Sequence, residues 1–162
     1  MLTFGGSDLQ QVGADAIAVL VNRAFVVEAW FAEGDRTTAE AIQALLASSA
    51  GTFLVATDAG ALVGCVYAER RTVTRGYIGL LAVEPARSGE GIGSRLMALA
   101  EEHLAREGCD AIDISVVNLR TELFPYYEQR GYRVGETLPF PRPSVVACHL
   151  VSMTKTLGLG GR

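Results

Sequence analysis

Apolar residues near the start of the chain recur with the period of a helix. Residues 17–25 hold apolar side chains at i, i+3, i+4 and i+7, which predicts a helix with one apolar face. Ser7, followed three residues later by glutamine, has the spacing of a capping box and predicts that the helical region opens there. Thr37, followed three residues later by glutamate, predicts the start of a second helix, which the small residues at 48–51 end.

The apolar pattern then takes the period of a strand. Residues 52–57 and 61–69 are rich in β-branched and aromatic side chains, and the turn residues at 58–60 between them predict a hairpin. Residues 77–83 form a nearly unbroken apolar run, which predicts a central strand covered on both faces. Pro85 ends that strand because proline cannot donate to a ladder and restricts the residue before it.

The rest of the chain alternates between helices and strands. The pattern predicts a first short strand at 2–4, a helix over 94–107, a strand over 111–117, a helix over 122–130 and strands near 132–137 and 145–154. This order predicts an α/β (α+β) sandwich with one mixed central sheet of about six to seven strands flanked by about four helices. A length of 162 residues fits one domain, expected over residues 1–157, with a flexible tail at 158–162.

Composition and charge exclude several classes of protein. Hydrophobic residues make up 49% of the chain and charged residues 20%, which is globular rather than disordered usage. The net charge of −4 gives no basic field for nucleic acid or an anionic membrane, and no apolar run is long enough to span a bilayer. The three cysteines predict neither a disulfide framework nor a metal cluster. A cytoplasmic protein without nucleic-acid or membrane partners is expected.

A glycine-rich loop between the strand at 77–83 and the helix at 94–107 is the main chemical signal. Glycine lets backbone N–H groups approach an anion closely, and the following helix adds its unpaired N–H groups and the positive end of its dipole. The loop therefore predicts a phosphate or pyrophosphate site. It lacks the Gly-Lys-Ser/Thr of a Walker A loop, and it follows a hairpin instead of the first strand of a βαβ unit.

From Thr52 to Arg130 the sequence resembles the GNAT superfamily of N-acetyltransferases. Three features carry the resemblance, and they occur in the order typical of the family: the apolar strand ending Leu81-Ala82-Val83-Glu84-Pro85, the loop Gly89-Glu90-Gly91-Ile92-Gly93, and the segment Tyr126-Tyr127-Glu128-Gln129-Arg130-Gly131-Tyr132. The resemblance implies a GNAT-like fold, acetyl-CoA as cosubstrate and no metal.

The same resemblance assigns a set of residues to the cofactor. The backbone of Leu81, Ala82 and Val83 would pair with the pantetheine arm as an added strand. The pyrophosphate would be held by the segment Ser88, Gly89, Glu90, Gly91, Ile92, Gly93 and Ser94. Ser88 is a departure, because the family usually has glutamine or arginine at this position; its amide and hydroxyl still offer hydrogen bonds. Arg87 stands one residue earlier.

Resemblance also implies a general acid. Tyr127 lies four residues before Gly131, where GNAT proteins place the tyrosine usually proposed to donate a proton to the departing thiolate. A half-buried tyrosine packed on the sheet is the structural alternative. Asn118 ends a strand where the family often places an asparagine that touches the cofactor, and it is equally suited to forming a turn.

The general base is less well defined, because the family varies here. Glu28 is the first candidate, since it lies between the first two helices, where the family commonly forms the acceptor wall; a solvated glutamate at a helix end is the alternative. Asp113 and Ser115 share one face of a strand and are the reserve candidates.

These features predict transfer of an acetyl group from acetyl-CoA to a primary amine by direct attack on the thioester. The acceptor is a small molecule or a protein, and the chain is expected to be a monomer or homodimer. A noncatalytic acyl-CoA sensor and a nucleotide-binding domain using the same loop are the alternatives. Neither composition nor charge identifies the acceptor.

Overall fold

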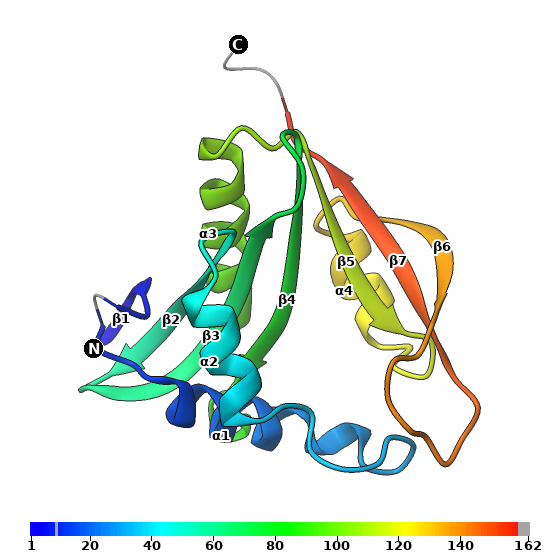
Figure 1. Cartoon of the computed structure of the whole chain (residues 1–162), viewed down its shortest axis with the longest axis horizontal. Helices are drawn as coiled ribbons and strands as arrows, with labels where there is room; N and C mark the ends of the chain where they lie inside the picture. Colours follow the sequence, from blue (N-terminus) through cyan, green and yellow to red (C-terminus); the bar gives the residue numbers. More distant parts are fainter. Residues whose placement is uncertain (9, 159–162) are drawn as a thin grey trace.

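One mixed sheet organises the computed structural model, which describes residues 1–8 and 10–158 (Figure 1). Within those residues seven strands are ordered β1-β2-β3-β4-β5-β7-β6. Their bounds are β1 Leu2–Gly6, β2 Gly51–Asp58, β3 Ala61–Arg70, β4 Arg75–Val83, β5 Ala111–Val117, β6 Arg133–Pro139 and β7 His149–Thr156. All neighbouring strands are antiparallel except β4 and β5, which are parallel.

Helices cover both faces of the sheet. They are α1 Ala14–Ala24, α2 Ala39–Ala47, α3 Ile92–Arg106 and α4 Leu123–Glu128, with 3₁₀ turns η1 Phe25–Glu28 and η2 Pro85–Arg87. Successive residues of β3 show the two layers, since strand side chains alternate between faces. Cys65 and Tyr67 belong to the core under α1 and α2, whereas Val66 and Ala68 belong to the core under α3. The predicted sandwich of one mixed sheet with flanking helices is thus confirmed.

Two predicted helix starts were wrong. α1 begins after Gly13, because Ser7 is buried in a turn where its N–H donates to the carbonyl of Phe53 at 3.0 Å. α2 is capped by Thr38, whose hydroxyl accepts the N–H of Ala41 at 3.1 Å. Thr37 cannot play this part because its backbone N–H and C=O are both bonded to the side chain of Asn22 in α1.

The last strand begins at His149 and not near 145, because the preceding loop is bonded elsewhere. The N–H of Val145 donates to the carbonyl of Phe31 at 2.8 Å, and the N–H of Glu33 donates to the carbonyl of Pro143 at 3.0 Å. These bonds fasten the β6–β7 loop to the segment between α1 and α2. Of the predicted tail, residues 159–162 lie outside the described residues. In the described part of the chain, no helix is both long and apolar enough to cross a bilayer.

Candidate active site

β4 and β5 separate along their length, and this separation creates the site (Figure 1). They pair only where Arg75 to Tyr77 meets Ala111 to Asp113, although β4 runs on to Val83 and β5 to Val117. Beyond that pairing, the backbone groups of β4 on the side of β5 have no neighbouring strand. An extended ligand with amide groups can therefore bond there as an added strand.

A bulge in β4 lies at the same place. Tyr67 of β3 pairs with Gly79, and Cys65 pairs with Ala82, so Leu80 and Leu81 together face a single residue of β3. Leu80 has a φ of 53°, a left-handed conformation that costs a non-glycine residue of order 1–3 kcal/mol. Strain of this kind persists where the surrounding structure imposes it, and here it turns peptide groups out of the ladder beside the gap.

The glycine-rich loop forms a turn that ends at the start of α3. Gly89 and Gly91 have φ values of 86° and 83°, conformations that favour glycine, and Gly91 is the N-cap residue of α3. No side chain caps the helix there, and its first main-chain bond runs from Arg95 to Gly91. The N–H groups of Ile92, Gly93 and Ser94 therefore point out of the helix end and are suited to an anionic group.

Arg87 and Glu90 are engaged with each other at the outer side of this loop. The guanidinium of Arg87 donates to both carboxylate oxygens of Glu90, at 3.0 and 2.8 Å, and to Asp58 at the end of β2 at 3.0 Å. The hydrogen bond from Arg87 is the main cause that lowers the pKa of the Glu90 carboxyl. The backbone of the loop, and not Glu90, therefore faces the position where an anion would bind.

Tyr127 lies on α4 between two other aromatic rings. The ring of Tyr126 is 5.1 Å away and that of Tyr132 is 5.9 Å away, both edge-on. Burial raises the pKa of Tyr127 to about 12, so its hydroxyl stays protonated at neutral pH. Arg130 stacks on Tyr126 at 3.7 Å and donates to the hydroxyl of Ser94, which ties α4 to the start of α3. The tyrosine and the glycine loop are thus fixed relative to each other.

Glu28, at the end of η1, is buried with two arginines. Its Oε2 accepts from Arg120 at 3.1 Å, and its Oε1 accepts from Arg142 at 3.3 Å. Arg120 also pairs with Glu122 at 2.9 Å. Each oxygen of Glu28 thus accepts from one arginine, so this carboxylate is committed to holding Arg120 and Arg142 in place.

The other predicted residues of β5 differ in their surroundings. Asp113 forms a two-pronged ion pair with Arg75, at 2.7 and 2.8 Å, which is the main cause that lowers its pKa. Asn118 accepts from the N–H of His149 at 2.8 Å and donates its own N–H to the carbonyl of His149 at 2.9 Å, which fastens the end of β5 to β7. Neither lines the cavities described below, whereas Ser115 does.

Three adjoining cavities connect these features into one trough. The first, of about 610 Å³, is lined by the glycine loop and the start of α3. The second, of about 370 Å³, lies in the gap between β4 and β5 and is lined by both Tyr126 and Tyr127. The third, of about 160 Å³, lies under the β6–β7 loop. Ser88 and Gly93 line both of the first two cavities, while Glu28 and Tyr77 line both of the last two.

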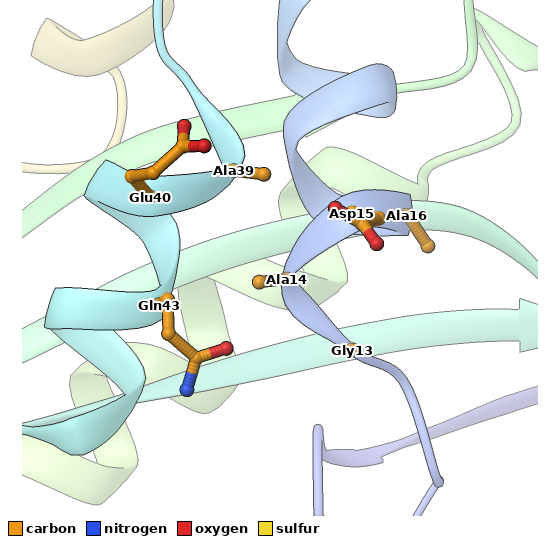
Figure 2. Close-up of a pocket in the computed structure, with 7 residues that line it drawn as sticks. All are labelled: Gly13, Ala14, Asp15, Ala16, Ala39, Glu40 and Gln43. Atoms are coloured by element: carbon orange, nitrogen blue, oxygen red, sulfur yellow. The ribbon is translucent and has the colours of Figure 1, made fainter.

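A separate hollow of about 600 Å³ lies between the first turns of α1 and α2. Figure 2 shows Asp15 on α1 and Glu40 with Gln43 on α2 around it. Two carboxylates and no cationic side chain line this hollow, so it is unsuited to phosphate groups. The trough is the better candidate.

The sequence matches the profile of the Acetyltransferase (GNAT) family over residues 16–132. The chain belongs to this family. GNAT proteins use acetyl-CoA and act on amine acceptors, and the predictions of family and enzyme class are confirmed at that level.

Curated relatives match parts of the chain. N-alpha-acetyltransferase 30 of Saccharomyces cerevisiae is 34% identical over 74 residues, which cover 43% of this chain and 42% of the relative. Mycothiol acetyltransferase of Propionibacterium freudenreichii is 31% identical over 91 residues, or 54% of this chain and 29% of the relative. The matched part of the chain thus spans less than half the length of these relatives.

Solved structures share the fold over nearly the whole chain. The ribosomal-protein-S18-alanine N-acetyltransferase of Escherichia coli superposes with a TM-score of 0.80 at 13% identity, covering 98% of this chain and 96% of that chain. A putative acetyltransferase of Salmonella typhimurium, solved with its cofactor acetyl-CoA, gives a TM-score of 0.72 at 18% identity, with coverage of 98% and 95%. At such low identity these structures establish the GNAT fold alone.

Sequence reasoning missed part of this GNAT site. Three residues line the second and third cavities, which are called the inner cavities below: Arg36, Tyr77 and Arg142. None of them belongs to a motif. Arg36 follows a polar turn, and Arg142 lies in a proline-rich loop, so both resemble solvated charges. The usable signal was Gly79, because a glycine inside a strand pattern often marks a close approach. In the structure an added Cβ at Gly79 would lie 2.8 Å from the ring of Tyr77.

Proposed function

We propose that this chain is an acetyl-CoA-dependent N-acetyltransferase acting on a primary amine. One observation carries the proposal: a single trough runs from the glycine loop, past the unpaired edge of β4, to Tyr127. Each part suits a different section of acetyl-CoA or of the attacking amine. A nucleotide would use the loop but would leave the edge of β4 without a partner.

The cofactor would be held mainly by backbone groups. The N–H groups at the start of α3 suit the pyrophosphate, with Gly89 to Ser94 as the proposed cradle and the amide and hydroxyl of Ser88 beside it. Leu81, Ala82 and Val83 line the middle cavity and offer main-chain bonds to the pantetheine arm. Asn118 would contribute by holding β5 in place, since its side-chain oxygen is already bonded to His149.

The reaction needs help for the departing sulfur. The neutral amine nitrogen forms a bond to the thioester carbon, and the carbon–sulfur bond breaks with its electron pair passing to sulfur, where negative charge develops. The proton lost from the nitrogen passes to solvent, and solvent protonates the thiolate, so that the products are the amide and the free thiol. We propose that the hydroxyl of Tyr127 donates a hydrogen bond to that sulfur. We propose that Glu28, with both oxygens bonded by arginines, holds Arg120 and Arg142 in position and does not itself deprotonate the amine.

The proposal names only the chemical class of the acceptor, a primary amine. One relative's name refers to an α-amino group and another's to mycothiol, so a protein and a small molecule both remain open. A cytoplasmic location and a monomeric or homodimeric state also remain predictions from the sequence.

Thiol release from acetyl-CoA, measured with a panel of primary amines, tests the proposal. We expect acetyl-CoA to bind and at least one amine to accelerate thiol release beyond its reaction without protein. Tight binding without turnover for any amine would favour an acyl-CoA sensor. Thermal protection by ATP or NAD but not by acetyl-CoA would favour a nucleotide-binding domain.

A further inference from the structure

The inner end of the trough carries excess positive charge. Arg36, Arg120 and Arg142 line the two inner cavities, and Glu28 is the single acidic residue lining them in the described part of the chain. The positive charge of Arg120 is balanced by its ion pairs with Glu28 and Glu122. Arg142 also forms an ion pair with Glu28, at 3.3 Å, which is longer than the pair between Arg120 and Glu28. Arg36 has no carboxylate within ion-pairing distance among the described residues, and its guanidinium instead lies over the ring of Phe25 at 5.3 Å.

Arg142 lies close enough to Arg36 to disfavour the charge of Arg36. The pKa of Arg36 is lowered, first by burial and then by repulsion from Arg142. Two guanidinium groups that face one small cavity are stabilised by an anion between them, since guanidinium binds carboxylate through paired hydrogen bonds. The 160 Å³ cavity that both line has space for a group of that size.

Two loops that line this end of the trough are joined to each other. Main-chain bonds from Val145 to Phe31 and from Glu33 to Pro143 join the β6–β7 loop to the α1–α2 segment, and an isolated bridge pairs Ala32 with Ser144. Figure 1 shows these two loops side by side at the end of the molecule where β4 and β5 are farthest apart. A small cavity bounded by two joined loops favours a small acceptor over a polypeptide that must continue past it.

We propose that the acceptor is a small primary amine that also carries a carboxylate, and that Arg36 and Arg142 bind this carboxylate in the inner cavity. The proposal rests on the acetyltransferase function proposed above. Tyr77 lines both inner cavities and therefore lies where the two cavities adjoin. An acceptor bound in this way would extend past Tyr77 with its amine toward Tyr127 and its carboxylate away from the thioester.

Matched acceptors test the proposal without changing the protein. α-Amino acids and ω-amino acids of increasing length are each compared with the corresponding carboxamide, which has nearly the same shape and no charge. We expect at least one acid to exceed its carboxamide in kcat/KM by about tenfold to a hundredfold, as for a charge-assisted pair in a partly buried site. Equal values for every acid and its carboxamide would overturn the proposal.

The variant Arg36→Gln then tests whether Arg36 causes the preference for the acid over its carboxamide. We expect this variant to lose about tenfold or more of the advantage of the acid, while the carboxamide rate and the acetyl-CoA affinity stay within about twofold. Arg106→Gln, which removes an exposed arginine at the far end of α3, is the matched control and should change neither. Full preference for the acid in Arg36→Gln would contradict the assignment.

Two further outcomes separate this proposal from the function on which it rests. If acidic peptides are acetylated and free amino acids are not, the acceptor is a polypeptide and the small-molecule proposal is wrong. If no amine releases thiol, the acetyltransferase proposal is the one that fails. Calorimetric binding of an N-acetyl amino acid beside its carboxamide then still tests the carboxylate site, and equal or absent binding of both would overturn it.

Discussion

Tyr127 is a half-buried tyrosine that lines the middle cavity, in the gap between β4 and β5. Its pKa of about 12 makes it a weaker acid than an ordinary thiol, whose pKa is near 8.5. Complete transfer of its proton to a thiolate is therefore unfavourable. A hydrogen bond to the developing charge requires no such transfer and is strongest in the transition state, which is where it accelerates the reaction.

Tyr127→Phe tests this role because it removes the hydroxyl and leaves the ring to pack. We expect single-turnover thiol release to slow by roughly 100-fold, the low end for an acid or a charge-stabilising donor. The Kd for acetyl-CoA should change by less than about twofold, since the charge on sulfur develops only during reaction. Tyr126→Phe, on the same helix and in the same trough, shows whether the effect belongs to Tyr127 or to either tyrosine hydroxyl. A wild-type rate in Tyr127→Phe would remove this residue from the mechanism.

Asp113 represents the opposite case, a predicted site residue that is committed to an ion pair. The bidentate bond from Arg75 lowers its folded-state pKa below the ordinary 3.8. The pair therefore stabilises the folded state above that pH, and its contribution is lost as the pH falls through the folded-state pKa.

Asp113→Asn should lower the Tm near neutral pH, by an amount corresponding to about 1 kcal/mol or less for a partly exposed pair. The difference from wild type should begin to shrink below roughly pH 4, the unfolded-state pKa, and disappear only below the lowered pKa of the folded state, where the wild-type carboxyl is also neutral. Thermal unfolding followed across this range measures it. A difference that persists unchanged at low pH would mean that the substitution destabilises the fold for a reason other than lost charge.

The loop and first turn of α3 act together as one binding element. Its two left-handed glycines, Gly89 and Gly91, shape the backbone, whereas Gly93 is already helical. A Cβ at Gly93 would lie 3.5 Å from Val83 and 3.6 Å from the hydroxyl of Tyr126, which is ordinary contact distance. The structure therefore separates the glycines needed for folding from the glycine that keeps space open in the trough.

Gly93→Val should abolish measurable acetyl-CoA binding in calorimetry, because the branched side chain would project into both of the cavities that Gly93 lines. The fold should survive, since valine is tolerated in a helix at least as well as glycine. Gly91→Val is a poorer test, because its φ of 83° would strain any branched residue. Ser88→Ala is the mild control and should weaken binding by about 1 kcal/mol. Unchanged affinity in Gly93→Val would place the cofactor elsewhere.

The separation of β4 from β5 divides the sheet into two parts. Strands β1 to β4 lie with α1 to α3 on one side of the gap, and β5 to β7 lie with α4 on the other (Figure 1). The two parts are joined by three residue pairs at the end of the gap where β4 and β5 are hydrogen-bonded. Side-chain contacts such as Arg130 to Ser94 also join them. A ligand in the gap would touch both parts and bind only the folded chain.

Acetyl-CoA at 100 times its Kd should therefore stabilise the protein by about 2.7 kcal/mol. For a domain of this size that corresponds to a rise in Tm of roughly 5–10 °C. Differential scanning fluorimetry measures the shift, with ATP at the same concentration as the control. The absence of any shift at a concentration shown by calorimetry to saturate the site would contradict binding across the gap.

The sequence by itself determined the features that depend on residues close together in the chain. The alternation of 111–117 predicted β5 with its observed bounds, and the glycine loop predicted an anion site at the start of a helix. Both follow from local rules, because backbone conformation and helix-end chemistry are set within a few residues. The family resemblance added Tyr127, which lies in the trough as expected.

Only the tertiary structure decided which charges meet in the inner cavities. Glu28 binds Arg120, which is 92 residues away, and Arg142, which is 114 residues away. Arg36 stands near them, and no carboxylate of the described residues lies within ion-pairing distance of it. No local pattern records such meetings, because a charged side chain in a loop has the same sequence signature whether it faces water or a cavity. Its role is fixed when distant loops pack and exclude the solvent that would otherwise screen it.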